Sequence, residues 1–222
     1  MESYNRKSII VDIYFSEQIT NILQTNSDPK SMIECKKRSD WDKWKVAIEI
    51  EIASLYKREV FSAVMPTPSG IFPIGYKWVF IRKRNKNNKV VRYKARLVAQ
   101  GFTQRPGVDF NETYSTVMSG IMFRYLILLA VQNCLSIQLM DIVTAYLYGS
   151  LDSNIYMKVP DGISIPNPKA NRNMYCVKLQ KLLYGLKQSG RMWYNRLSEF
   201  LKLKGYTNND DCPCVFIKKS ST

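Results

Sequence analysis

Residues 77–99 read KWVFIRKRNKNNKVVRYKARLVA, and this stretch decides how the first half of the chain is expected to fold. Two runs rich in β-branched and aromatic residues, Lys77–Ile81 and Val90–Ala99, flank a polar segment that contains three asparagines. β-branched and aromatic residues favour extended backbone, whereas Asn favours turns. The pattern therefore predicts a β-hairpin whose strands are the two runs.

The hairpin region is also the most asymmetric charge patch of the sequence. Ten Lys or Arg residues and no acid lie between Lys77 and Arg105, in a chain of 222 residues with a net charge of +15. A surplus of this size favours polyanionic partners, with nucleic acid first and an anionic membrane second. The alternative is that the surplus charge serves solubility alone. A basic ribbon can follow a phosphate backbone or close over a triphosphate. The competing interpretation is an edge strand that Lys and Arg protect from aggregation.

The remaining elements mix helices and strands without regular alternation, which is typical of the α+β class. Residues 1–38 are polar and show no clear period, so we expect a loosely ordered lead-in before a domain spanning 39–222. The first expected helix is capped by Ser39 and carries Trp41, Trp44, Ile48, Ile52 and Leu55 at helical spacing. A buried helix is expected over Ile121–Val131 and a short one from Thr144 or Ala145 to Tyr148. A last helix is expected over Met192–Lys204. A half-buried strand is predicted over Leu135–Met140 and a short one over Ile155–Val159.

The amino-acid composition limits the catalytic and metal-binding groups that the chain can offer. The chain has no His, which excludes Ser-His-Asp and Cys-His nucleophilic catalysis, so carboxylates, Lys or Tyr must do any catalytic work. Five scattered cysteines are typical of free thiols in a reducing compartment, and without His or a second Cys pair they do not favour zinc. No signal peptide is visible, and the longest uncharged stretch, Tyr125–Met140, is too short and too polar to span a membrane.

Asp141 is the acid that most needs an explanation. It is the only acid between Met118 and Leu151, and it follows the strand predicted over Leu135–Met140. A carboxylate at a strand end is costly unless it is solvated, paired or bound to a metal. It could equally cap the helix that follows, and periodicity alone does not decide between the two roles.

Four further segments stand out in order along the chain: Gly75–Phe80 (GYKWVF), Tyr93–Gln104 (YKARLVAQGFTQ), Gln138–Leu147 (QLMDIVTAYL) and Leu183–Ser189 (LYGLKQS). Together they resemble copia-type retrotransposon reverse transcriptases. The family's order and spacing are followed from about Asp28 to Phe216, which makes the signal far more specific than any single short match.

The resemblance implies an α+β right-hand polymerase, with fingers and a partial palm. Its basic hairpin resembles the fingers, where Arg96, and with less support Arg82 or Lys83, would contact the phosphates of the incoming nucleotide. Asp141 resembles the first catalytic aspartate, which would ligate two divalent ions, Mg²⁺ or alternatively Mn²⁺, with the carbonyl of Ile142 as a further ligand. Tyr146, with Thr144 and Ala145 beside it, resembles the aromatic residue under the nucleotide sugar, although most such tyrosines are core residues. Gly185, Lys187 and Ser189 resemble the segment that contacts the template.

The sequence also departs from the family pattern. Ser115-Thr116-Val117 stands where these enzymes usually have Ser-Pro-Val, and Ser189-Gly190-Arg191 where they usually have Ser-Pro-Arg. The family's Tyr-Val-Asp-Asp hairpin, with the other catalytic carboxylates, is expected shortly after Phe216–Lys218, whereas the sequence ends at Thr222. Asp210 and Asp211 are expected to form a turn instead. We therefore expect a fold truncated before that hairpin, and a chain that does not polymerise by itself.

The partners implied by the resemblance are an RNA template, a DNA primer, deoxynucleoside triphosphates and the rest of a Pol polyprotein, with no membrane. The implied location is a cytoplasmic virus-like particle, with nuclear entry of the integration complex as a further expectation. The alternative to a polymerase segment is a non-catalytic nucleic-acid-binding remnant of a decayed element that uses only the basic hairpin.

Overall fold

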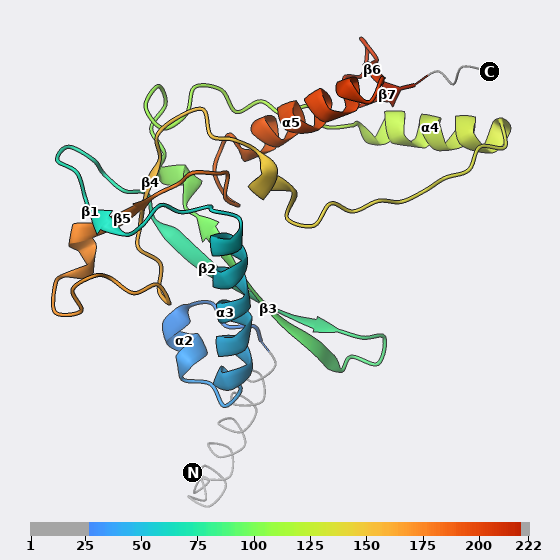
Figure 1. The fold of residues 1–222 in the computed structure, drawn as a ribbon. Helices are drawn as coiled ribbons and strands as arrows, with labels where there is room; N and C mark the ends of the chain where they lie inside the picture. The colour runs from blue at the N-terminus through green and yellow to red at the C-terminus, as the bar shows by residue number, and fades with distance from the viewer. Residues whose placement is uncertain (1–26, 219–222) are drawn as a thin grey trace, which may run out of the picture. The chain divides into compact units, whose positions relative to one another are not determined.

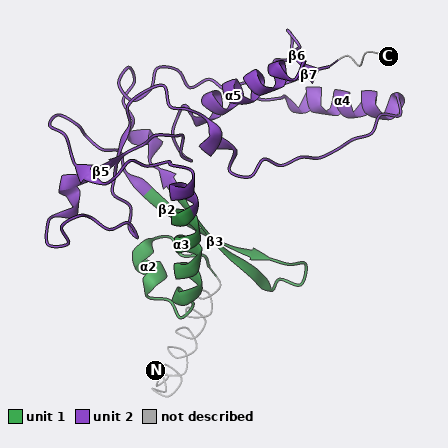
Figure 2. Ribbon diagram, viewed as in Figure 1, with its two compact units in different colours: residues 1–53, 77–97 green, residues 54–76, 98–222 purple. Residues whose placement is uncertain are grey.

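The computed structural model describes residues 27–218, which form two compact units (Figure 2). Of the described residues, 27–53 and 77–97 belong to unit 1, and 54–76 and 98–218 belong to unit 2. Helices and strands are mixed along the chain without βαβ alternation, so the structure is compatible with the expected α+β class (Figure 1).

Two helices precede the hairpin, and a capping side chain begins the first of them. Helix α2 (Met32–Lys36) starts after Ser31, whose hydroxyl accepts a hydrogen bond from the Glu34 amide. This helix lies within the segment predicted to be a loosely ordered lead-in, and residues 1–26 of that segment lie outside the described residues. Helix α3 (Trp41–Lys57) has its first intrahelical bond at Asp40 O, one residue after the expected cap Ser39.

The predicted hairpin is confirmed. Strands β2 (Tyr76–Arg84) and β3 (Val90–Ala99) form a two-stranded sheet. Asn85 closes the turn, because its side chain accepts from the amides of Asn87 and Lys89 at 3.0 and 2.9 Å. Trp44 of α3 packs in unit 1 with ring centroids 5.3 Å from Phe80 and 4.7 Å from Tyr93. These edge-on aromatic contacts fill the core of the unit.

Unit 2 is centred on a small antiparallel sheet of order β1-β5-β4, formed by Met65–Pro66, Tyr175–Lys178 and Tyr156–Lys158. The core around this sheet is fully buried and includes Ile155, Met157, Val177, Leu179, Leu182 and Leu183. The strand predicted over Ile155–Val159 is therefore confirmed as β4.

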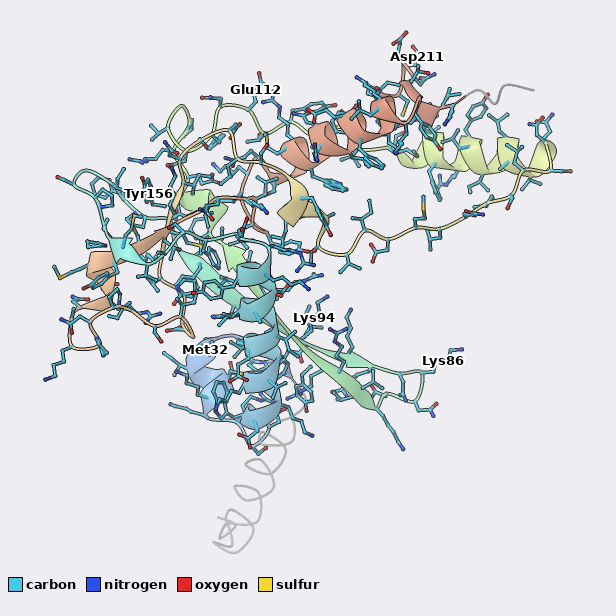
Figure 3. The ribbon with its side chains drawn as sticks, viewed as in Figure 1. Met32, Lys86, Lys94, Glu112, Tyr156 and Asp211 are labelled. Atoms are coloured by element: carbon cyan, nitrogen blue, oxygen red, sulfur yellow. The ribbon has the colours of Figure 1, made fainter. Side chains whose placement is uncertain are left out.

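Short helices and one long helix complete unit 2. The 3-10 helices are η1 (Gly101–Thr103), η2 (Ala145–Tyr148) and η3 (Arg172–Met174), and α5 spans Ser189–Leu203. Strands β6 (Thr207–Asn208) and β7 (Phe216–Ile217) form a second hairpin, whose connection contains Asp210 and Asp211 as predicted (Figure 3 labels Asp211). None of the described helices is long and apolar enough to cross a membrane.

Two predictions for residues 120–140 need correction. The expected helix is present as α4 (Gly120–Gln132), capped by Ser119, but it is not buried: none of its residues is classed as buried. The strand expected over Leu135–Met140 is absent, and these residues are exposed in an irregular segment after α4 (Figure 1). Alternation of apolar and polar residues shows that a segment could line a sheet, but a strand also needs a neighbour to accept its hydrogen bonds. Within the described residues, no strand pairs with this segment.

Candidate nucleic-acid and nucleotide site

The two faces of the β2–β3 hairpin separate its basic residues into two sets. Successive side chains of a strand point to opposite faces, and burial alternates along both strands. Arg82 shares the buried face of β2 with Trp78 and Phe80. The opposite face carries the set that we name the basic row: Lys83, Arg92, Lys94 and Arg96. Figure 3 shows Lys94 on the body of the hairpin and Lys86 at its turn.

Arg82 is engaged within unit 1. Its Nη2 donates to Asp40 Oδ2 at 2.8 Å, and its guanidinium lies 5.7 Å from the centroid of the Trp44 ring. The side chain is only 4% exposed. Burial alone would raise the pKa of Asp40, but the hydrogen bond and charge of Arg82, with those of Arg38, hold it below its ordinary value. The structure thus favours a packing role for Arg82 over the contact with nucleotide phosphate that the resemblance implied.

The basic row is a site of mutual repulsion. The pKa of Lys94 is lowered, first by partial burial and then by the positive charges of Arg96, Arg92 and Lys83, with Glu51 acting in the opposite direction. A polyanion placed on this face would offset this effect, because it favours the charged form of Lys94. Lys83 and Arg96 were predicted from the sequence, whereas Arg92 and Lys94 were not singled out. Both lie at steps of two residues from Arg96, so the two-residue period of a strand would have placed them on the same face.

In unit 2, the segment predicted to bind the nucleotide sugar lies beside the segment predicted to bind the template. The Tyr146 ring packs edge-on against Tyr184 with centroids 5.5 Å apart, and η2 packs against α5. Thr144 begins η2 in a left-handed conformation (φ 58°), and its hydroxyl donates to Val143 O. The structure therefore brings Thr144, Ala145 and Tyr146 close to the turn at residues 183–189.

The turn presents its three predicted template residues differently. Gly185 is exposed and has φ +89°, and a Cβ there would lie 2.2 Å from Ala99 O, so only glycine fits. Lys187 is exposed, with Nζ 4.6 Å from the centroid of the Phe110 ring. Ser189 is buried, and its hydroxyl donates to Leu183 O at 2.8 Å. Ser189 thus closes the turn, while Lys187 and the Gly185 backbone face solvent.

Asp141 and Ile142 lie in the exposed segment that follows α4. Their neighbours Leu139 and Met140 are 100% and 87% exposed, so this stretch lacks the packing of a formed catalytic site. The described residues contain no group of three or more His, Cys, Asp or Glu side chains that could hold a metal. One carboxylate and one carbonyl do not fit a two-ion site, so Asp141 in this arrangement can only be one contributor to such a site.

Comparison with known proteins places the chain in a family. The family described as "Reverse transcriptase (RNA-dependent DNA polymerase)" matches residues 58–222, and the chain belongs to it. Within that family the chain is of the copia type, as the four sequence segments indicated. No solved structure matches the chain.

The relatives are Pol polyproteins of transposons. The Retrovirus-related Pol polyprotein from transposon TNT 1-94 of Nicotiana tabacum is 36% identical over 200 residues, which cover 90% of this chain and 15% of that polyprotein. The corresponding polyprotein from transposon RE2 of Arabidopsis thaliana is 34% identical over 195 residues, covering 88% and 13%. The truncated Ty1-A Gag-Pol polyprotein of Saccharomyces cerevisiae is 34% identical over 145 residues, covering 63% and 11%. The chain thus spans less than a sixth of each of these relatives.

Proposed function

We propose that this chain supplies the fingers and part of the palm of an RNA-directed DNA polymerase within a retrotransposon Pol polyprotein. Its substrates would be an RNA template, a DNA primer and deoxynucleoside triphosphates, and it would act with the rest of the polyprotein. For such elements we propose a cytoplasmic virus-like particle as the setting, with later nuclear entry of the integration complex. The observation that carries the proposal is the basic row, in which four cationic side chains share one face of the hairpin, and partial burial together with the charges of the other three lowers the pKa of Lys94.

Lys83 and Arg96 are the proposed ligands of the triphosphate, with Arg92 and Lys94 extending the same face along β3. Arginine offers a planar fork of donors that matches phosphate oxygens, and lysine adds a compact charge. Tyr146 is the proposed contact with the nucleotide sugar, because a rigid ring that packs on Tyr184 can exclude a bulkier sugar by its volume. Lys187 and the Gly185 backbone are the proposed template contacts.

Asp141 is the proposed catalytic carboxylate from this chain, and Mg²⁺ is the proposed cofactor of the complete polymerase, with Mn²⁺ as a substitute. Two such ions stabilise the attacking and leaving oxygens of the transferred phosphate when they are bound. Because the described residues contain no group of three or more His, Cys, Asp or Glu side chains that could hold a metal, we expect the 222-residue chain to bind nucleic acid without extending a primer.

That same observation favours a second candidate function, a non-catalytic nucleic-acid-binding remnant of a transposon. A remnant would need the basic row and would make no use of Asp141. The two candidates agree on salt-dependent binding, since both use phosphate contacts, and they differ on whether Asp141 matters.

Binding is tested first with the Lys83→Ala/Lys94→Ala double variant and an RNA–DNA hybrid duplex in fluorescence anisotropy. Each lost phosphate contact makes the plot of log K against log salt less steep by roughly 0.9. The slope of the double variant is therefore expected to be less steep by about 1.8 than that of the unaltered chain. The matched control is Lys57→Ala/Lys169→Ala, which removes two exposed lysines of unit 2. Equal slopes for both variants and the unaltered chain would remove the support for either candidate.

Catalysis is tested in a chimera in which this chain replaces the matching segment of the tobacco polyprotein. Asp141→Asn is expected to abolish primer extension by the chimera without changing its affinity for the hybrid, since the side chain is exposed. Asn keeps the size of the side chain and removes its charge. Unchanged extension by Asp141→Asn would contradict the polymerase assignment of this residue and favour the remnant.

A further inference from the structure

Two glutamines that are far apart in sequence form a buried amide pair in unit 2. Gln104 lies after η1, and Gln188 lies immediately before α5, yet Gln104 Nε2 donates to Gln188 Oε1 at 3.0 Å. Gln104 is 4% exposed and Gln188 is fully buried. Burying a side-chain amide is unfavourable unless its donors and acceptors are satisfied, so such a pair must be held by further hydrogen bonds.

The further bonds of the pair run to the backbone on both sides of it. Gln188 Nε2 donates to Asp109 O at 2.9 Å, and the same carbonyl accepts from Ser153 Oγ at 2.7 Å. On the other side, the backbone amide of Lys187 donates to Gln104 Oε1 at 2.8 Å. The amide pair therefore ties the 101–110 loop to the 183–189 turn through Asp109 and Lys187.

Close backbone contacts keep these two segments in register. A Cβ on Gly101 would lie 2.1 Å from Gly185 O, and the Ala99 amide donates to Tyr184 O at 2.7 Å. Neither segment can slide past the other without breaking these contacts. The relative placement of Lys187 and Phe110 is thus set by the packed backbone and by the amide pair together.

Lys187 is held at both ends. Its backbone amide donates to Gln104, and its ammonium group lies 4.6 Å from the centroid of the ring of Phe110, the residue that follows Asp109, whose carbonyl accepts from Gln188. A free lysine side chain loses rotamer freedom when a partner fixes it. A lysine that is already oriented loses less of this freedom on binding, and the binding is correspondingly tighter.

We propose that Gln104 and Gln188 are positioning residues that orient Lys187 toward a phosphate of the bound nucleic-acid strand. The inference rests on the proposed function, in which Lys187 contacts the template. Neither glutamine touches the strand, since both are buried, and their effect on binding passes through Lys187 alone.

The test compares Lys187→Ala, the double variant Gln104→Met/Gln188→Met, and the triple variant that combines them. Met has a volume similar to that of Gln, and replacing both members leaves no unmatched side-chain amide in the core. Affinity for an RNA–DNA hybrid duplex is measured by fluorescence anisotropy over a range of salt concentrations. Lys169→Ala, an exposed lysine in the loop between β4 and η3, serves as the control for loss of one charge.

Lys187→Ala is expected to weaken binding about fivefold and to lower the salt slope by roughly 0.9, as for one lost phosphate contact. The Met double variant is expected to weaken binding to a similar degree. In the Lys187→Ala background the same double substitution is expected to have no further effect, because residues acting through one another are not additive. A general loosening of unit 2 would instead weaken binding in both backgrounds.

Additive losses, or unchanged affinity of the Met double variant beside a weakened Lys187→Ala, would overturn the positioning role. If the Met double variant does not unfold cooperatively, Gln104→Asn carries the same expectation, because it keeps the amide but is one methylene too short to reach the Lys187 amide. If Lys187→Ala left the affinity unchanged while Lys83→Ala/Lys94→Ala still weakened binding, this inference would be refuted and the proposed function would stand. Insensitivity of all these variants would refute the proposed function as well.

Discussion

At the scale of single residues, the turn at 183–189 depends on a glycine that no other residue can replace. Gly185 combines a left-handed backbone (φ +89°) with a Cβ position 2.2 Å from the Ala99 carbonyl oxygen. Gly107 has a similar backbone (φ +72°) but open space around its Cβ position. The two positions therefore separate the cost of the backbone conformation from the cost of the steric clash.

We predict that Gly185→Ala lowers the free energy of unfolding by about 3 kcal/mol, whereas Gly107→Ala lowers it by about 1 kcal/mol. Both variants bear the strain of the left-handed conformation, and only the first must also push the β3 backbone aside. Urea unfolding followed by circular dichroism measures both changes. Similar losses in the two variants would show that the turn yields without disturbing β3.

The Asp40–Arg82 pair makes the stability of unit 1 depend on pH. The pKa of Asp40 is lowered in the folded chain, where burial opposes the change and the two arginines produce it. Stability from this group is then fully present above the unfolded pKa of about 3.9, and it is lost as the pH falls toward the lower folded pKa.

Asp40→Asn is accordingly predicted to lower the free energy of unfolding by about 3 kcal/mol at pH 6, because it leaves the Arg82 charge buried. At pH 3 the difference from the unaltered chain should be smaller, since the unaltered chain has lost part of the same contribution. Unfolding in urea at the two pH values checks this. Asp42→Asn, an exposed neighbour at the start of α3, is the control and is expected to change little.

At the scale of elements, α4 departs from the pattern of a surface helix. Its sequence is almost entirely apolar, with Arg124 as its single charged residue, and Ile121, Phe123 and Leu128 are 80%, 59% and 67% exposed. A helix of this composition normally lies inside a protein core. Its capping by Ser119 and its high content of helix-forming residues explain why it forms, but they do not supply a surface to bury it.

We predict that Ile121→Lys/Leu128→Lys lowers the affinity of the chain for the dye ANS about tenfold, because it removes two of the exposed apolar side chains that the dye would cover. The helix itself should persist in circular dichroism, because Lys is a good helix former. Ile33→Lys on α2 is the matched control, as a single exposed apolar residue. If the control lowered dye binding equally, α4 would not be the dominant apolar surface.

At the scale of the whole molecule, the buried core of unit 2 differs from the segment around Asp141, which belongs to the same unit, in how its backbone is held. The amide of Leu179 donates to Ile155 O and that of Ile74 to Tyr156 O, each at 2.8 Å and within the buried core of unit 2. Residues 136–143, in contrast, are exposed and irregular.

Hydrogen exchange is expected to reflect this difference. The amides of Leu179 and Ile74 should exchange only when unit 2 unfolds globally, whereas those of 136–143 should exchange nearly as fast as in an unstructured peptide. Mass spectrometry of the exchanged chain measures both. Strong protection of 136–143 would mean that this segment is packed or paired in solution, contrary to the structure described.

Much of the fold could be predicted because local residue patterns determine it. The hairpin followed from β-branched runs around Asn85, and α3 and α5 followed from apolar residues at helical spacing. The positions of Lys83 and Arg96 on the exposed face could have been separated from Arg82 by alternation, since Arg82 is two residues from Phe80 on the buried face. Gln104 and Gln188 could not be paired by any local pattern, because they are 84 positions apart in the sequence.

The amino-acid sequence by itself determined the family, the basic hairpin and the residue types available for chemistry, because motifs, charge and local propensity are properties of neighbouring residues. Only the tertiary structure decided that Arg82 packs against Asp40, that Ser189 closes a turn, and that a buried amide pair holds Lys187. It also decided that α4 and the residues before Asp141 are exposed. Burial and pairing depend on which distant segments meet, and that is set by the balance of packing over the whole chain rather than by any short stretch of it.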